Sequence, residues 1–200
     1  FVFSRRYNRR EGMDGGTKVE LLTNAIIRLP EYRVVSNALA EGRVPACATG
    51  ISGVHKAHII SALCEEHGRK AVVVVGDEAE AQRMAEDLQA LGLSACFYPY
   101  RDFGVRDVDT YSREYEHQRL GVLSRMLSGS CDVVLCCIDA ALQYTIPPKE
   151  LRKRISSFRA GDTAAPEKLT RMLFEAGYER AEQVESAGQF AVRGGIFEFF

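Results

Sequence analysis

The sequence lacks the cysteine and histidine spacing that is typical of a metal site. Its six cysteines include no Cys-x-x-Cys pair, and its four histidines are scattered along the chain. Most of the cysteines stand in apolar segments, which favours buried thiols in a reducing compartment over a disulfide framework. We therefore expect a cytoplasmic protein that holds no metal.

Charge imbalance and long apolar runs are also missing. A net charge of −1 over 200 residues gives no global field that would attract nucleic acid or an anionic membrane. No apolar run approaches the roughly 20 residues that a membrane helix needs, and the opening "FVFSRRYNRR" has no signal-peptide core. We expect no membrane partner. The basic run at Lys149, Arg152, Lys153 and Arg154 could touch phosphates, although a solvated helix face is the favoured interpretation.

What the sequence does contain is an alternation of buried apolar segments and helical segments between about residues 44 and 143. The segments predicted as strands are "RVPACATG", "KAVVVVG", "SACFYPY" and "CDVVLCCID". Continuous apolar strands that alternate with helices indicate an α/β domain with a parallel sheet. Before them, residues 18–40 predict two short helices broken by Pro30. A helix from Lys56 to His67 is predicted to end at Gly68, and the helix after the second strand to begin at Asp77 and end at Gly92.

The pattern changes near Pro147. A helix follows between Pro166 and Gly177, and "GQFAVRGGIFEFF" predicts two strands around a Gly194-Gly195 turn. We therefore divide the chain into a leader at 1–17 that is non-native or disordered, an α/β domain at 18–146, and the start of a smaller α+β domain at 147–200, which we expect to be incomplete. Since Met13 is the first plausible initiator, residues 1–12 are interpreted as translated upstream sequence.

The stretch "GISGVHKA" matches part of the phosphate-binding P-loop template G-x-x-x-x-G-K-[ST]. His55 replaces the second glycine, and Ala57 replaces the hydroxyl residue that would hold Mg²⁺. We therefore favour a relic that does not hydrolyse nucleotide, with a weak anion site at Lys56 or a functional nucleotide site as alternatives. The residues of this degenerate P-loop are Gly50, Ser52, Gly53, His55, Lys56 and Ala57.

Arg193 is a charged residue inside the apolar hairpin, between Val192 and Gly194. Burial without a partner would be costly, so this side chain must face solvent, an acidic residue or another protein. On residue type alone, a structural ion pair and a binding role remain open.

Several further segments carry a family resemblance. "GISGVHKA", "VVVVGDEAEAQRMAEDLQALG", "FYPYRDF", "YEHQRLGVLSRMLSG", "FRAGD" and "LFEAGYERAEQVESAGQFAVRGGIFEFF" follow one another at compatible distances. Together they resemble the N-terminal region of the bacterial transcription-repair coupling factor (Mfd) family, from about Leu21 to Phe200. This region is homologous in that family to the start of UvrB, an excision-repair helicase subunit with an intact P-loop, and UvrB is our alternative. The short loop from Tyr100 to Tyr111, His55 and Ala57 favour the coupling factor.

The resemblance implies a degenerate P-loop domain of the helicase-superfamily type, followed by a small domain that recruits UvrA. The family's UvrA-contacting positions match Arg193 and Phe197. A second contact arginine does not align cleanly, because Glu179 takes its place with Arg180 adjacent, and Arg180 is therefore the weaker match. The resemblance implies no catalytic residue and no cofactor in this part of the family's chain. ATP, Mg²⁺, RNA polymerase and double-stranded DNA would be bound by domains that follow it, and we expect this part to be a monomer.

Overall fold

The computed structural model describes residues 2–5, 23–101, 109–156, 158, 163–186 and 188–200. The contacts between residues divide the chain into two compact units. One consists of Phe1–Tyr100 and Ser128–Gln143, and the other of Arg101–Leu127 and Tyr144–Phe200. Among the described residues, the helices are all too short or too polar to cross a membrane.

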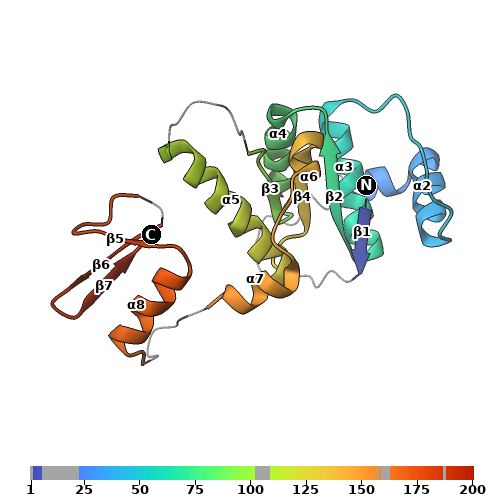
Figure 1. The fold of residues 1–200 in the computed structure, drawn as a ribbon. Coiled ribbons are helices and arrows are strands. Elements are labelled where there is room, and N and C mark those ends of the chain that lie inside the picture. The colour runs from blue at the N-terminus through green and yellow to red at the C-terminus, as the bar shows by residue number, and fades with distance from the viewer. Residues whose placement is uncertain (1, 6–22, 102–108, 157, 159–162, 187) are drawn as a thin grey trace. The chain divides into compact units, whose positions relative to one another are not determined.

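A four-stranded sheet is the centre of the first unit (Figure 1). Its order is β1-β2-β4-β3, with β1 at Val2–Arg5, β2 at Arg69–Val75, β3 at Ala95–Phe97 and β4 at Val133–Cys137. The strands β2, β4 and β3 run parallel, and β1 pairs with β2 in the antiparallel direction. The prediction of an α/β domain with a parallel sheet is therefore confirmed.

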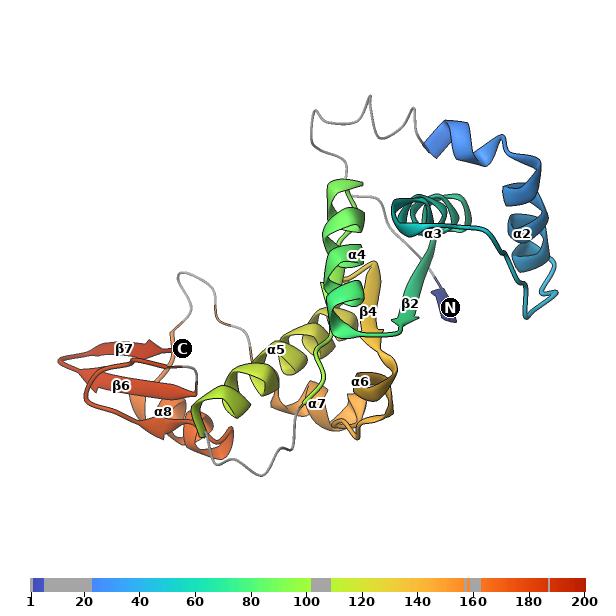
Figure 2. The same ribbon diagram turned by 90° about the horizontal axis from the view of Figure 1, so that it is seen from above.

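Two helices cover one face of this sheet, α3 at Gly53–His67 and α4 at Glu78–Ala90 (Figure 2). Their apolar faces meet alternate strand residues in one buried core, as expected when successive strand side chains point to opposite faces. That core contains Ala57, Ile60, Cys64, Ala71, Val73, Ala81, Met84, Ala85, Leu88, Leu93, Ala95, Val133 and Leu135. The short helix α6, Ile138–Leu142, follows β4.

The predicted helix boundaries of the first unit agree with the local chemistry. The Asp77 carboxylate caps α4 by accepting a hydrogen bond from the Glu80 N–H at 2.7 Å. Gly68 ends α3 in the left-handed conformation, with a φ of 57° that favours glycine. Residues 23–27 form a helical segment, and α2, Pro30–Ala40, starts at the proline.

The prediction of a buried strand at "RVPACATG" is wrong. Residues 43–50 contain no strand and are exposed. The outer edge of β2 is already paired with β1, and Pro45 has no backbone N–H to offer a ladder. The "KAVVVVG" strand also differs from expectation, because Val74 of β2 is 45% exposed and only one face of β2 is well buried. In contrast, all residues of β4 are buried.

The second unit contains α5 at Asp109–Ser128, α7 at Pro148–Arg154 and α8 at Pro166–Glu175. Its three-stranded sheet has the order β5-β6-β7, with β5 at Glu179–Arg180, β6 at Gln189–Arg193 and β7 at Ile196–Phe199. β5 is parallel to β6, and β7 is antiparallel to it. The predicted hairpin is confirmed, since Gly194 and Gly195 form its turn with φ values of 55° and 89°.

Two features bear on the predicted division into domains. The strand β1 lies within the predicted leader, and the origin of residues 1–12 stays a prediction. The helix α5 groups with residues 144–200, whereas the sequence placed it in the larger domain. It also begins at Asp109, within a polar stretch that the sequence assigned to a loop, because polar residues are compatible with a helix as well as with a loop.

Candidate functional site

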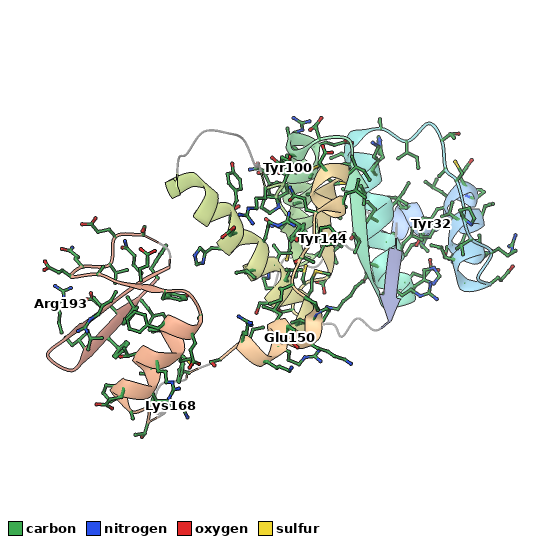
Figure 3. All side chains as sticks on the ribbon, in the orientation of Figure 1. Tyr32, Tyr100, Tyr144, Glu150, Lys168 and Arg193 are labelled. Carbon is green, nitrogen blue, oxygen red and sulfur yellow. The ribbon has the colours of Figure 1, made fainter. Side chains whose placement is uncertain are left out.

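Arg193 is the last residue of β6 and stands directly before the Gly194-Gly195 turn (Figure 3). Its side chain is 58% exposed, and its Nη2 donates a hydrogen bond to Oε2 of Glu198 on β7 at 2.8 Å. The sequence left solvent, an acidic residue or another protein open as the environment of Arg193. In the structure, Arg193 is exposed and is paired with an acidic residue, Glu198. An exposed ion pair of this kind is worth about 0–1 kcal/mol, so it constrains the arginine only weakly.

The two faces of the β6–β7 hairpin have different roles. Arg193 lies opposite Ile196, and Val192 lies opposite Phe197. Because neighbouring residues of a strand point to opposite faces, Arg193 and Phe197 lie on different faces of the sheet. The apolar neighbour of Arg193 is therefore Ile196, which is 65% exposed. Sequence reasoning missed Ile196, although a two-residue turn fixes this pairing.

Phe190 anchors the hairpin on the face away from Arg193. It is 0% exposed and meets the ring of Phe174 on α8 edge-to-face, with 5.1 Å between the ring centroids. The ring of Phe197 is parallel to that of Phe190, with 6.1 Å between the centroids. Phe197 is thus a half-buried packing residue in this structure, and its predicted contact with UvrA stays a prediction.

Arg180 is exposed and lies in strand β5, which pairs with the edge of β6 that β7 does not occupy. It is paired with Phe190, so its side chain belongs to the face of Phe190 and not to that of Arg193. Arg180 and Arg193 both line a shallow pocket of 560 Å³, together with Ala181, Glu182 and Val192. The structure therefore brings two of the three predicted contact residues to one pocket. Two arginines can bind carboxylates in a bidentate geometry, and Glu182 makes this surface mixed in charge.

The degenerate P-loop lies in the first unit, at the start of α3. Gly50 has a φ of 76°, Ser52 precedes the helix, and Gly53 is its first residue. The imidazole Nδ1 of His55 lies 3.3 Å from the Ser52 Oγ, and both residues are exposed. His55 therefore presents a ring where the P-loop template has a glycine that lets the backbone approach phosphate.

Lys56 and Ala57 are engaged with other parts of the first unit. The Lys56 Nζ lies 3.1 Å from Oε1 of Glu80, whose other oxygen accepts a hydrogen bond from the Gly76 N–H at 3.4 Å. Lys56 and Glu80 both line a mostly apolar cavity of 840 Å³. Ala57 is 0% exposed and belongs to the core under the sheet. The carboxylate of Glu80 therefore occupies the position that an anion bound to the Lys56 ammonium would take.

A polar cluster joins α2 to α3 around the Glu66 carboxylate. Tyr32, Arg33 and Ser36 donate hydrogen bonds to Glu66 with donor–acceptor distances of 2.7–2.8 Å. Burial alone would raise the pKa of Glu66, but the hydrogen bonds from Ser36 and Tyr32 and the charges of Arg33 and His67 outweigh it and lower the pKa below 4.5. The pKa of Tyr32 is raised by its burial and by Glu66. This cluster connects two helices and is structural.

The remaining candidates from the sequence form no reactive centre. On α7, Lys149, Arg152 and Arg154 are exposed, and Lys153 pairs with Glu150 at 2.8 Å, which fits a solvated helix face. Burial raises the pKa of the Cys64 thiol to about 12. Within the described part of the chain, histidine, cysteine and carboxylate side chains form no cluster of three or more that could hold a metal ion.

Comparison with known proteins places these features in a family. Residues 157–200 match the model of the UvrB interaction domain. A transcription-repair-coupling factor of Bacillus subtilis is 29% identical over 173 residues, which cover 85% of this chain and 15% of the relative. One from Haemophilus influenzae is 30% identical over 144 residues, 70% of this chain and 12% of the relative. One from Staphylococcus aureus is 20% identical over 161 residues, 80% of this chain and 14% of the relative.

This chain therefore spans about 15% or less of the length of these relatives. The match to the UvrB interaction domain covers α8 and the whole β5-β6-β7 sheet, including Arg180, Arg193 and Phe197.

Proposed function

We propose that this chain recruits UvrA in transcription-coupled nucleotide-excision repair. The premise is that it belongs to the N-terminal UvrB-homology region of the transcription-repair coupling factor family. The observation that carries this proposal is the exposed Arg193 at the turn of a hairpin, within the segment that matches the UvrB interaction domain. A partner can reach this side chain without unfolding the sheet, because the aromatic packing of Phe190 lies on the other face.

The chemistry of this surface supports a protein partner. Arginine beside an exposed apolar residue is a frequent composition of interface hot spots, and here Arg193 lies across from Ile196. Its guanidinium can grip a carboxylate of UvrA through two parallel hydrogen bonds. Arg180, which lines the same pocket, would add a second donor. The three relatives described above are coupling factors, so the alternative of a UvrB-type helicase subunit is not favoured.

We further propose that the first unit is a P-loop-like domain of the helicase type that serves as a scaffold and does not hydrolyse ATP. The ion pair of Lys56 with Glu80 and the buried Ala57 support this, because phosphate would compete with a carboxylate and Mg²⁺ would find no hydroxyl. In the longer proteins of the family, ATP with Mg²⁺, RNA polymerase and double-stranded DNA would be bound outside the region that this chain covers. We place the protein in the cytoplasm and expect this chain to be monomeric.

Hydrogen exchange in the presence of UvrA tests the recruiting surface. Amides of β6 and β7 should exchange more slowly in the complex, whereas those of α4 in the first unit should exchange at unchanged rates. Protection confined to the first unit, or none at saturating UvrA, would remove the small sheet as the recruiting surface.

A further inference from the structure

Three side chains share one face of the β6–β7 hairpin near its turn. Arg193 pairs across the strands with Ile196, and Glu198 pairs with Ala191. Glu198 is therefore the diagonal neighbour of Arg193, at a distance that long side chains can bridge. Arg193, Ile196 and Glu198 are all exposed, so the turn end of this face is open to a partner.

The guanidinium of Arg193 is already held by a carboxylate of its own hairpin. Its Nη2 donates to Oε2 of Glu198 at 2.8 Å, and the two side chains are 58% and 46% exposed. A partner carboxylate that binds the guanidinium in a bidentate geometry uses one N–H of Nη2, so it would share that nitrogen with Glu198. The two carboxylates would also repel each other if both approached the arginine closely.

Building on the proposed recruitment of UvrA, we infer that Glu198 is an internal competitor for the partner carboxylate that Arg193 binds. In the free protein, Glu198 keeps Arg193 paired. On binding, the partner carboxylate displaces Glu198, which turns to solvent. This exchange costs little free energy, because the ion pair between Arg193 and Glu198 is exposed. The competition by Glu198 also discriminates against partners whose acidic group fits Arg193 poorly.

The competing possibility is that Glu198 itself binds a basic side chain of UvrA. The two roles predict opposite effects of Glu198→Gln, which keeps the size of the side chain and removes its charge. Competition predicts tighter binding of UvrA. The Kd should fall by up to about fivefold if the full free energy of the exposed ion pair, about 1 kcal/mol, no longer opposes binding. A direct contact with a basic group predicts weaker binding.

The experiment measures the Kd of UvrA for four proteins by titration calorimetry: the unmodified chain, Glu198→Gln, Arg193→Ala, and the double variant. Removal of a negative charge could alter the affinity through the long-range field alone. The double variant controls for this, because Glu198→Gln should have no effect where Arg193 is already absent. Glu150→Gln is a matched control, since Glu150 forms an exposed ion pair with Lys153 on α7.

The inference requires that Glu198→Gln tightens binding, that this gain disappears in the double variant, and that Glu150→Gln leaves the Kd unchanged. It is overturned if Glu198→Gln weakens binding or leaves it unchanged while Arg193→Ala weakens it. It is equally overturned if the gain persists without Arg193. If Arg193→Ala has no effect on the Kd, the proposed recruiting surface itself fails, which is a different result from failure of the competition.

Discussion

Replacement of Phe190 by alanine should destabilise the small sheet while leaving the stability of the first unit unchanged. Phe190 is 0% exposed and is the residue through which β6 packs on α8, in edge-to-face contact with Phe174 at 5.1 Å. The ring of Phe197, on the same face of the hairpin, is parallel to that of Phe190, with 6.1 Å between the centroids. The substitution removes both aromatic contacts and leaves a cavity between the sheet and the helix.

The magnitude follows from the burial of the ring. A fully buried Phe→Ala change costs about 3–5 kcal/mol, because the lost transfer free energy adds to the cost of the cavity. Phe199 provides a matched control, since it lies opposite Phe190 on β7 but is 57% exposed. With less than half of its surface removed from water, Phe199→Ala should cost about 1 kcal/mol.

The assay is hydrogen exchange of the β6 amides, which reports the opening free energy of this sheet directly. The sequence has no tryptophan, so intrinsic fluorescence would report only on its tyrosines. Phe190→Ala should lower the opening free energy of β6 severalfold more than Phe199→Ala does, with the β4 amides unaffected. Equal losses from the two variants would refute the packing role that the structure gives to Phe190.

Three further predictions concern the rest of the chain. With Mg²⁺-ATP the chain should release no phosphate, with or without DNA, because Lys56 is paired with Glu80 and Ala57 offers no hydroxyl; turnover that disappears in Lys56→Ala would contradict this. Duplex DNA should bind weakly, with a slope of log K against log salt of about −4 if the four basic residues of α7 all neutralise phosphates; tight binding at physiological salt would argue against a solvated face. The pKa of Glu66 is lowered in the folded state, so its stabilisation is present above the unfolded value of 4.5 and is lost as the pH falls through the folded pKa. In Glu66→Gln, the free energy of unfolding should therefore depend less steeply on pH in that window. If its pH dependence at acid pH equals that of the unmodified chain, Glu66 contributes nothing to the acid sensitivity.

The sequence predicted best those elements that have strong local signals. Asp77 as a helix cap, Gly68 as a helix end and the Gly194-Gly195 turn all act through the backbone within a few residues. The apolar runs of β2, β3 and β4 predicted parallel strands correctly, because a short continuous apolar run is itself a local signal, although β2 is well buried on one face only.

The errors arose where pairing across the chain decides the structure. "RVPACATG" has the composition of a strand, but the edge of β2 is taken by residues 2–5, which no local pattern could reveal. β5 is only two residues long and is a strand because it pairs with β6. At the candidate site, the sequence identified Arg193 as a charge that needs a partner. The family resemblance joined Arg193 with Phe197 as contact residues. The hairpin register instead places Ile196 and Glu198 on the face of Arg193.

The affinity of UvrA for Arg193→Ala tests the central claim most directly. We expect the Kd to rise by at least about 30-fold, which corresponds to the hot-spot threshold of about 2 kcal/mol. Arg193→Lys should recover only part of the affinity, because an ammonium cannot make the bidentate contact. Arg171→Ala, which removes an exposed arginine paired with Glu175 on α8, should bind as the unmodified chain does. The melting temperature of Arg193→Ala should barely change. An unchanged Kd for Arg193→Ala, with a large fall in melting temperature, would instead make Arg193 a structural ion-pair residue and contradict the account.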